Sequence, residues 1–188
     1  MPTTPTAAPA VSSTVGLKNL VIAPMETDTE TETTYGTLQR VAGAIEASIT
    51  PDNADPELAF TTKLADLPLT SQKMLFGNQL DSNGVLVRTS TDKPGYFAVG
   101  FKSEKSNGKF RYVWLFKVRA KPVTENYATK EGKTITRQTG EVEWVAVKHI
   151  SDNRYQVVAD EDENGFTAAM AATFLDSVYE PVFTQNEG

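Results

Sequence analysis

The chain has 188 residues and a net charge of −6, with 39% hydrophobic and 22% charged residues. This length suits one domain, which would bury roughly 70% of the surface that its unfolded chain exposes. The sequence has no cysteine, which excludes a disulfide scaffold, a thiolate nucleophile and a cysteine-ligated metal. No apolar run approaches the ~20 residues of a membrane span, and the first residues lack the apolar core of a secretory signal. We therefore expect a protein that is made and used without crossing a membrane.

The first third of the chain alternates strand patterns with polar segments. Residues 1–15 consist mostly of Pro, Thr, Ala and Ser, which cannot build a core, and predict a flexible N-terminal arm. Strands are predicted at Gly16–Ala23, Ala44–Thr50 and Leu58–Leu64. Between the first two, alternating acidic residues and threonines predict a solvated loop at Glu26–Glu32.

A short helix is expected after the third strand. Asp66 or Thr70 can cap its start, and the helix would run through Phe76. Gly77 then supplies the left-handed conformation that often ends helices.

The most informative stretch, residues 96–121, predicts a β-hairpin. Asn107-Gly108 suits a type I′ turn, and the return strand is rich in aromatic and β-branched residues. Strand alternation puts Phe110, Tyr112, Trp114, Phe116 and Val118 on one face and Arg111, Val113, Leu115, Lys117 and Arg119 on the other. The second face mixes apolar and basic residues. This mixture is typical of a strand that is half covered by something else, for which another subunit is a candidate.

The last third begins with a long polar connection at 122–140, and loops of this length are usually functional or ordered by a partner. Two strands, Glu141–Ile150 and Arg154–Ala159, are predicted to pair about a turn at 151–153. A C-terminal helix is predicted from about Thr167 to Tyr179, because apolar residues recur there every four positions: Phe166, Met170, Phe174 and Val178.

These elements predict an α+β, mainly β fold: an antiparallel β-sandwich or partly open barrel with one packing C-terminal α-helix and one short helix. The predicted organisation is a single domain at 16–183, with the long loop at 122–140 and a C-terminal tail at 184–188.

Charge is unevenly distributed along the sequence. Between Lys102 and Arg137 there are ten basic and three acidic residues, a local balance of +7 that leaves −13 to the remainder. The basic segment could neutralise nucleic-acid phosphates, but no nucleic-acid motif accompanies it. It could instead meet an acidic surface on a second copy. The third interpretation is that charges which are segregated in the sequence are mixed on the folded surface.

Residues that could carry chemistry are few. Asp160–Gly165 matches the start of a calcium-binding EF-hand loop, but the twelfth position, which needs a bidentate Glu, is Ala171. We interpret the acidic run instead as complementing the N-terminus of the predicted C-terminal helix. The lone histidine, His149, has no second imidazole and is expected at a surface or an interface. There is no P-loop, dinucleotide fingerprint or nucleophile elbow. We therefore predict no catalytic residue, no metal, no cofactor and no enzymatic activity.

Several motifs resemble the phi13-type major tail proteins, the tail tube proteins of long-tailed phages. The resemblance extends over nearly all of 16–183, and its most specific parts are the hairpin Phe101-Lys102-Ser103-Glu104-Lys105-Ser106-Asn107-Gly108 and the strand Tyr112-Val113-Trp114-Leu115. Further matching stretches are Gly16–Pro24, Tyr35-Gly36-Thr37, Ser48–Asp55, Leu64–Leu69, Gly77, Asn83–Leu86, and Phe116-Lys117. The chain departs from the family where Asp55 passes almost directly to Phe60, since family members carry a longer acidic stretch there.

The resemblance implies a structural virion protein that self-assembles into stacked hexameric rings, forming the tail tube through which DNA passes. It implies other copies of the chain as partners, together with the tape measure, tail terminator and distal tail proteins. The protein would reside in the virion, and in the host cytoplasm during assembly. DNA would traverse the lumen without specific binding, and no membrane is involved. The alternative is a monomeric β-sandwich binding module for a cell-surface polysaccharide, which would show exposed aromatic and acidic residues in one groove.

Within such a tube, residues 1–14 and 122–140 are expected to order only on assembly. The candidate subunit-interface residues are basic side chains of the long loop and acidic side chains of the early loop: Lys130, Lys133, Arg137, Glu26, Asp28, Glu30 and Glu32. A lumen that passes DNA must repel phosphate rather than hold it. Glu141 and Glu143 share one strand face and are the candidate lumen-lining residues.

Overall fold

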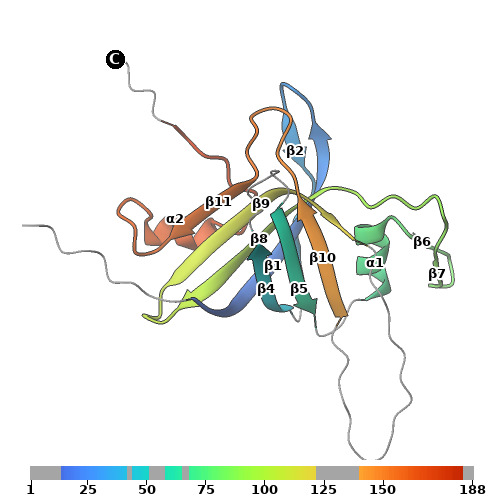
Figure 1. Ribbon diagram of the computed structural model, residues 1–188, viewed down its shortest axis with the longest axis horizontal. Helices are drawn as coiled ribbons and strands as arrows, with labels where there is room; N and C mark the ends of the chain where they lie inside the picture. Colours follow the sequence, from blue (N-terminus) through green and yellow to red (C-terminus); the bar gives the residue numbers. More distant parts are fainter. Residues whose placement is uncertain (1–13, 42–43, 51–57, 65–67, 122–139, 184–188) are drawn as a thin grey trace, which may run out of the picture.

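The computed structural model describes residues 14–41, 44–50, 58–64, 68–121 and 140–183 (Figure 1). The described part is mainly β, with antiparallel pairing throughout and two helices, which confirms the predicted fold class. Its elements are β1 (Thr14–Asp28), β2 (Thr33–Tyr35), β3 (Gln39–Arg40), β4 (Ala44–Thr50), β5 (Leu58–Leu64), α1 (Leu69–Phe76), β6 (Gln79–Leu80), β7 (Leu86–Val87), β8 (Phe97–Lys105), β9 (Phe110–Ala120), β10 (Gly140–Ala146), β11 (Gln156–Asp160) and α2 (Ala168–Thr173).

One large sheet organises the domain, with strand order β2-β1-β8-β9-β10-β5-β4. It curls enough that β1 and β4 contact each other. At the end of the sheet that carries α1, β6 and β7 pair in a separate two-stranded hairpin and form a lobe that projects from the domain (Figure 1).

The predicted pairing of the last two strands is wrong. β10 and β11 do not pair with each other; they lie in succession along the same edge of β9. β10 pairs with the C-terminal end of β9, where Trp144 is opposite Ala120, and β11 pairs with the N-terminal half, where Val157 is opposite Trp114. The loop between them stays bonded to β9, because Val147 N donates to Lys117 O. β10 therefore continues the sheet toward β5 and β4, while β11 ends as an outer strand.

The β8–β9 hairpin is confirmed, but its turn is not type I′. That turn needs positive φ at two central residues, and of Asn107 and Gly108 only Gly108 has it, at 80°. Gly108 N donates to Lys105 O at 2.9 Å, and Lys105 N donates to Lys109 O at 2.7 Å. This pattern is a type I turn followed by a bulge with glycine in the left-handed region.

Both faces of β9 are buried by the chain itself, so no second subunit is needed to cover the mixed face. One face joins a core shared with β1, β8, β10 and α1, whose members include Leu20, Ile22, Leu75, Phe97, Val99, Phe101, Val113, Leu115, Val142 and Trp144. The other face carries Tyr112, Trp114 and Phe116 into a second core with Phe174 and Leu175. A Cβ at Gly100 would lie 2.8 Å from the Trp114 ring, which explains the glycine there.

The strict alternation predicted for β9 fails at its C-terminal end. Val118 belongs to the core of Val113 and Leu115, not to that of Trp114. The register explains the change, since Phe97 is opposite Val118 whereas Val99 is opposite Leu115. Two residues of β9 therefore face one of β8, and this β-bulge reverses the side-chain direction beyond it.

The two helices differ from their predictions in different ways. α1 ends at Gly77 with φ 71°, as predicted, but its N-cap is Pro68 and Thr70 lies inside the helix. α2 spans six residues rather than the predicted thirteen, with the Thr167 hydroxyl capping Met170 N at 3.3 Å. Phe174 is buried and packs on Tyr112, Phe166 and Tyr179, and its carbonyl accepts from Trp114 Nε1 at 2.9 Å. The apolar residues predicted after Thr173 therefore lie in turns rather than in the helix.

Candidate assembly surface

Within the described residues, most cations of the predicted basic segment pair with carboxylates of the same chain. The Lys105 ammonium is buried and pairs with Asp160 at 2.7 Å and also with Asp162. Arg111 contacts the second oxygen of Asp160 at 2.8 Å, and Lys109 pairs with Asp162 at 2.9 Å. Burial alone would raise the pKa of Asp160, but hydrogen bonds from Lys105 and Arg111 outweigh it and lower that pKa. In this region, charges that are separate in the sequence are mixed in the fold.

This arrangement corrects the interpretation of the acidic run as the complement of a helix N-terminus. Asp160–Gly165 ends β11 and turns before α2, so the carboxylates face the β8–β9 hairpin rather than the first turn of a helix. The Asp160 and Asp162 oxygens that a calcium ion would need are taken by Lys105, Lys109 and Arg111. In the part of the chain that the structure describes, no group of three or more His, Cys, Asp or Glu side chains is arranged to hold a metal.

Of the candidate interface residues, Asp28 is engaged inside the subunit. Its carboxylate pairs with Lys117, accepts from Thr33 Oγ1 at 3.1 Å and from Ile150 N at 3.1 Å, and is only 7% exposed. Burial raises the pKa of Asp28, but the bonds from Lys117 and Ile150 outweigh this effect, and the pKa lies below its ordinary value. Asp28 is thus a poor candidate for a contact with a second copy, because its carboxylate already neutralises Lys117.

Glu26, Glu30 and Glu32 are placed differently. The β1–β2 hairpin projects from the end of the domain near the loop after β10 (Figure 1). Glu30 and Glu32 are exposed at its tip, and Glu26 is exposed beside Gly36. The hairpin is anchored by Asp28 and by the Thr33 hydroxyl, which lies 3.0 Å from Ser151 Oγ. Its carboxylates at the tip are therefore held outward on a fixed support.

His149 is part of this anchor, and its predicted surface or interface position is wrong. It is 2% exposed and packs against the rings of Tyr35 and Phe116. The Tyr35 hydroxyl donates to Phe116 O at 2.9 Å, so His149 Nε2, 2.5 Å away, donates to that hydroxyl. His149 Nδ1 lies 3.3 Å from Asp152 Oδ1. No sequence pattern links Tyr35 to a histidine 114 positions away, so this contact could not have been predicted.

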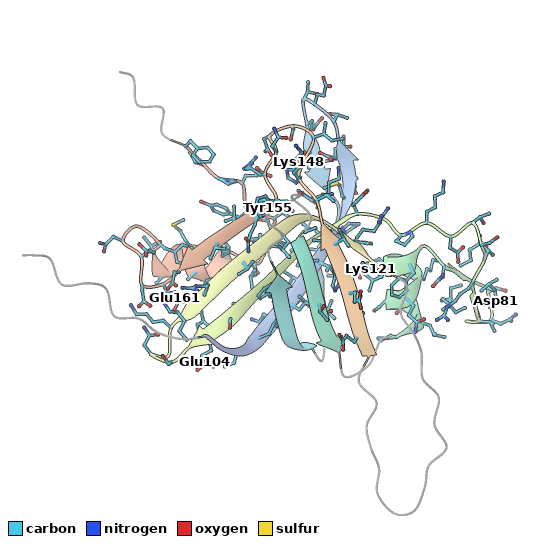
Figure 2. The ribbon with its side chains drawn as sticks, in the orientation of Figure 1. Asp81, Glu104, Lys121, Lys148, Tyr155 and Glu161 are labelled. Carbon is cyan, nitrogen blue, oxygen red and sulfur yellow. The ribbon has the colours of Figure 1, made fainter. Side chains whose placement is uncertain are left out.

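The candidate lumen residues lie together on one exposed face of β10. Glu141 and Glu143 point away from the core, while the alternating residues Val142 and Trp144 are buried in it. Trp144 Nε1 donates to the buried Thr62 hydroxyl at 2.9 Å, which fixes the strand against β5. Lys121 lies beside β10 (Figure 2), with its ammonium 3.3 Å from Glu143. The pair is exposed and therefore weak.

The three basic interface candidates, Lys130, Lys133 and Arg137, lie outside the described residues, as does nearly all of 122–140. Their expected contact with the acidic hairpin therefore stays a prediction. Residues 1–13 and 184–188 lie outside as well.

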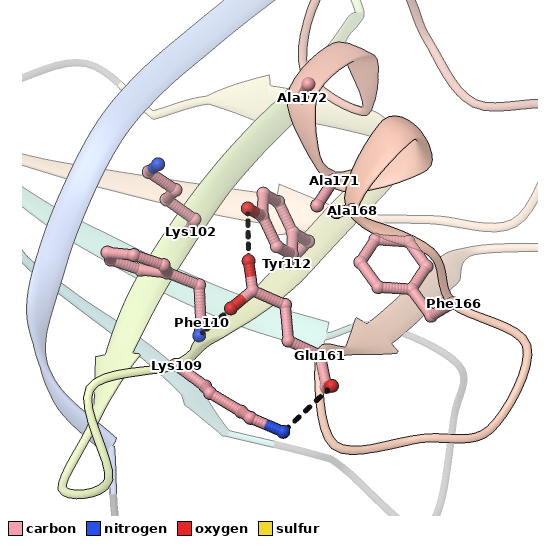
Figure 3. Close-up of a pocket in the computed structure, with 9 residues that line it drawn as sticks. All are labelled: Lys102, Lys109, Phe110, Tyr112, Glu161, Phe166, Ala168, Ala171 and Ala172. Atoms are coloured by element: carbon pink, nitrogen blue, oxygen red, sulfur yellow. Dashed lines mark hydrogen bonds between the residues drawn. The ribbon is translucent and has the colours of Figure 1, made fainter.

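A groove that sequence analysis missed lies between α2 and the β8–β9 hairpin (Figure 3). It encloses about 490 Å³ and is lined by Lys102, Lys109, Phe110, Tyr112, Glu161, Phe166, Ala168, Ala171 and Ala172. We call it the α2 groove. Glu161 crosses its base: one carboxylate oxygen accepts from Tyr112 OH and the other from Phe110 N, both at 2.9 Å. Burial and then Glu161 raise the pKa of Tyr112 to about 12. The aromatic return strand was the only sequence signal for this groove.

Comparison with protein-family models finds no match, and comparison with curated proteins finds none either. Within the described ranges, neither helix is long and apolar enough to cross a membrane.

Proposed function

We propose that this protein is the subunit of a phage tail tube, a structural virion protein that assembles into hexameric rings stacked around a channel for DNA. The proposal follows the motif resemblance of residues 16–183 to phi13-type major tail proteins. It includes a virion location, contacts with tape measure, tail terminator and distal tail proteins, and no enzymatic role.

The observation that supports self-assembly most is the set of outer strands. Among the described residues, β2 and β11 each pair with a strand on one side only. The other edge of each carries backbone N–H and C=O groups that a strand of a second copy can pair with. Where the edge of one strand pairs with a different edge of the next copy, the contact is heterologous, and repeating it gives a closed ring or an open filament. A tube of stacked rings would combine a contact that closes within each ring with a contact that repeats along the tube.

The β10 face supports the channel part of the proposal. Duplex DNA carries a negative charge roughly every 1.7 Å along its axis, and a basic wall would bind it by releasing counterions. Glu141 and Glu143 instead place carboxylates on an exposed sheet face above a rigid core. If this face lines the lumen, DNA is repelled from the wall and slides without being held.

The polysaccharide-binding alternative finds weaker support. The α2 groove has aromatic walls, but Tyr112 is only 3% exposed and offers little ring surface for stacking. Both carboxylate oxygens of Glu161 already accept hydrogen bonds, which leaves little capacity for sugar hydroxyls. A polysaccharide-binding site would need an exposed aromatic ring and carboxylate oxygens that are free to accept hydrogen bonds.

The test is the assembly state of the purified chain. Analytical ultracentrifugation over a concentration series, followed by negative-stain electron microscopy, should give large species that are visible as rings or hollow tubes. A single monomeric species at every concentration, with specific retention on a polysaccharide column, would favour the alternative.

A further inference from the structure

We propose that the segment spanning residues 180–187 of one subunit docks in the α2 groove of a second copy of this chain. The inference rests on the proposed function, since it names one contact by which subunits would join.

The segment presents apolar surface that its own subunit does not cover. Val182 and Phe183 are 87% and 79% exposed, more than any other large hydrophobic side chain in the described residues. Just before them, Glu180 is held by Arg154 at 3.2 Å, so the segment starts from a fixed point on the domain. Exposed apolar side chains that lie together can mark a surface that contacts another protein.

The α2 groove supplies a matching apolar surface. Phe110 and Phe166 flank it, and the α2 side exposes only methyl groups, from Ala168, Ala171 and Ala172 (Figure 3). Small side chains on α2 leave the volume that a valine and a phenylalanine require. Burying the two would remove apolar area from water on both partners, which is the main driving force for association.

Charge favours the same occupant. Lys102 lies at the groove with its ammonium 4.2 Å from the centre of the Phe110 ring, and no carboxylate contacts it among the described residues. The one carboxylate in the groove, Glu161, has both oxygens engaged. The incoming segment has no lysine or arginine and carries Glu187, whereas Glu180 is already paired with Arg154 of its own subunit. An acidic segment with two apolar anchors therefore fits a groove with aromatic walls and an available cation.

Because the chain has no cysteine, the contact can be tested by disulfide cross-linking without background thiols. Two single variants, Ala172→Cys in the groove and Thr184→Cys beside the Phe183 anchor, are mixed under mild oxidation and analysed on non-reducing gels. The expected result is a covalent dimer containing one copy of each variant, at least tenfold more abundant than in the control mixture. The control mixes Ala172→Cys with Val85→Cys, since Val85 is 55% exposed but lies in the β6–β7 lobe.

A charge exchange provides the second readout. Lys102→Glu should lower the rate of cross-linking between Cys at position 172 and Cys at position 184 several-fold, and Glu187→Lys in the partner variant should restore it. Restoration would exclude a general folding defect as the cause of the loss.

The outcomes separate this inference from the proposed function. If wild-type protein forms tubes but the groove and segment cysteines cross-link no faster than the control, the docking is wrong and the tube proposal stands. A double variant, Ala172→Cys with Thr184→Cys, that gives only intramolecular disulfide would also overturn the inference, because the segment would then fold back on its own subunit. If wild-type protein stays monomeric, the tube proposal fails, and the absence of mixed dimer at high concentration would overturn the docking as well.

Discussion

The chain has two acidic segments that look alike in sequence and are used in opposite ways. In the turn after β11, the carboxylates of Asp160, Glu161 and Asp162 face inward and are bonded to the β8–β9 hairpin. In the β1–β2 hairpin only Asp28 faces inward, while Glu30 and Glu32 are exposed at the tip. The first segment stabilises the subunit by holding a hairpin in place. The second leaves its charge available to another molecule.

The same division holds for two phenylalanines nine positions apart. Phe174 is 4% exposed within an aromatic cluster, whereas Phe183 is 79% exposed. Carboxylates and phenylalanines thus each divide into side chains that are buried or bonded within the subunit and side chains that are exposed. We expect variants of the first kind to change stability and variants of the second kind to change assembly.

The largest effect is expected from Phe174→Ala. Removing this buried ring leaves a cavity against Tyr112 and Phe166 and should lower the free energy of unfolding by about 3–5 kcal/mol. The measurement is urea denaturation of the monomer. Phe183→Ala is the matched control and should leave the unfolding midpoint unchanged while weakening assembly. Equal, small effects for both would mean that the α2 stripe is not part of the core.

The next largest effect is expected from Asp28→Ala, which should lower the free energy of unfolding by about 3 kcal/mol, because Lys117 would be left in a poorly solvated site without its partner. The matched control is Glu30→Ala, for which we expect a change within about 0.5 kcal/mol. Similar losses for the two variants would contradict the claim that only one of these carboxylates serves the subunit.

Acid should selectively reduce the stability that the inward-facing carboxylates contribute to the fold. The folded-state pKa values of Asp28 and Asp160 lie below the ordinary value, so the unfolded chain binds more protons than the folded chain. Their contribution is fully present above the unfolded pKa of about 3.9, and it is lost as pH falls through the lower folded values. Urea midpoints measured from pH 6 to pH 3 should therefore fall toward acid. They should fall less steeply in Asp28→Asn, and midpoints that rise toward acid would refute the assignment.

The smallest effect on stability is expected for Glu141→Lys with Glu143→Lys. Both side chains are exposed, and the one ion pair, with Lys121, is weak, so the unfolding free energy should change by about 0.5 kcal/mol or less. In assembled tubes, however, the substitution should create salt-sensitive binding of short duplex DNA, measured by fluorescence anisotropy. No gain of DNA binding by intact tubes would place this face away from the channel.

Local sequence signals predicted the elements whose causes are local. Ala44–Thr50 and Leu58–Leu64 are strands with the predicted bounds. Gly77 ends α1 in the left-handed conformation, as predicted from the ability of glycine to adopt positive φ. The four-residue spacing in 166–178 was interpreted as one long helix. A six-residue helix followed by turns places three of the four predicted side chains, Phe166, Phe174 and Val178, in the second core.

Contacts between distant segments could not be predicted in this way. Two neighbouring strands with a turn between them indicate a hairpin, and only the tertiary structure shows that β10 and β11 both pair with β9. The pairing of Lys105 with Asp160 and Asp162 joins positions 55 and 57 apart, for which one sequence carries no signal. The exposed face of Glu141 and Glu143, in contrast, follows directly from strand alternation.

The tube proposal is tested most directly by electron cryomicroscopy of the purified chain at high concentration. We expect stacked six-fold rings around an open channel, with Glu141 and Glu143 on the inner wall and a negative potential along it. A discrete monomer at every concentration would contradict the tube. A tube whose inner wall is continuously positive would contradict the role assigned to β10.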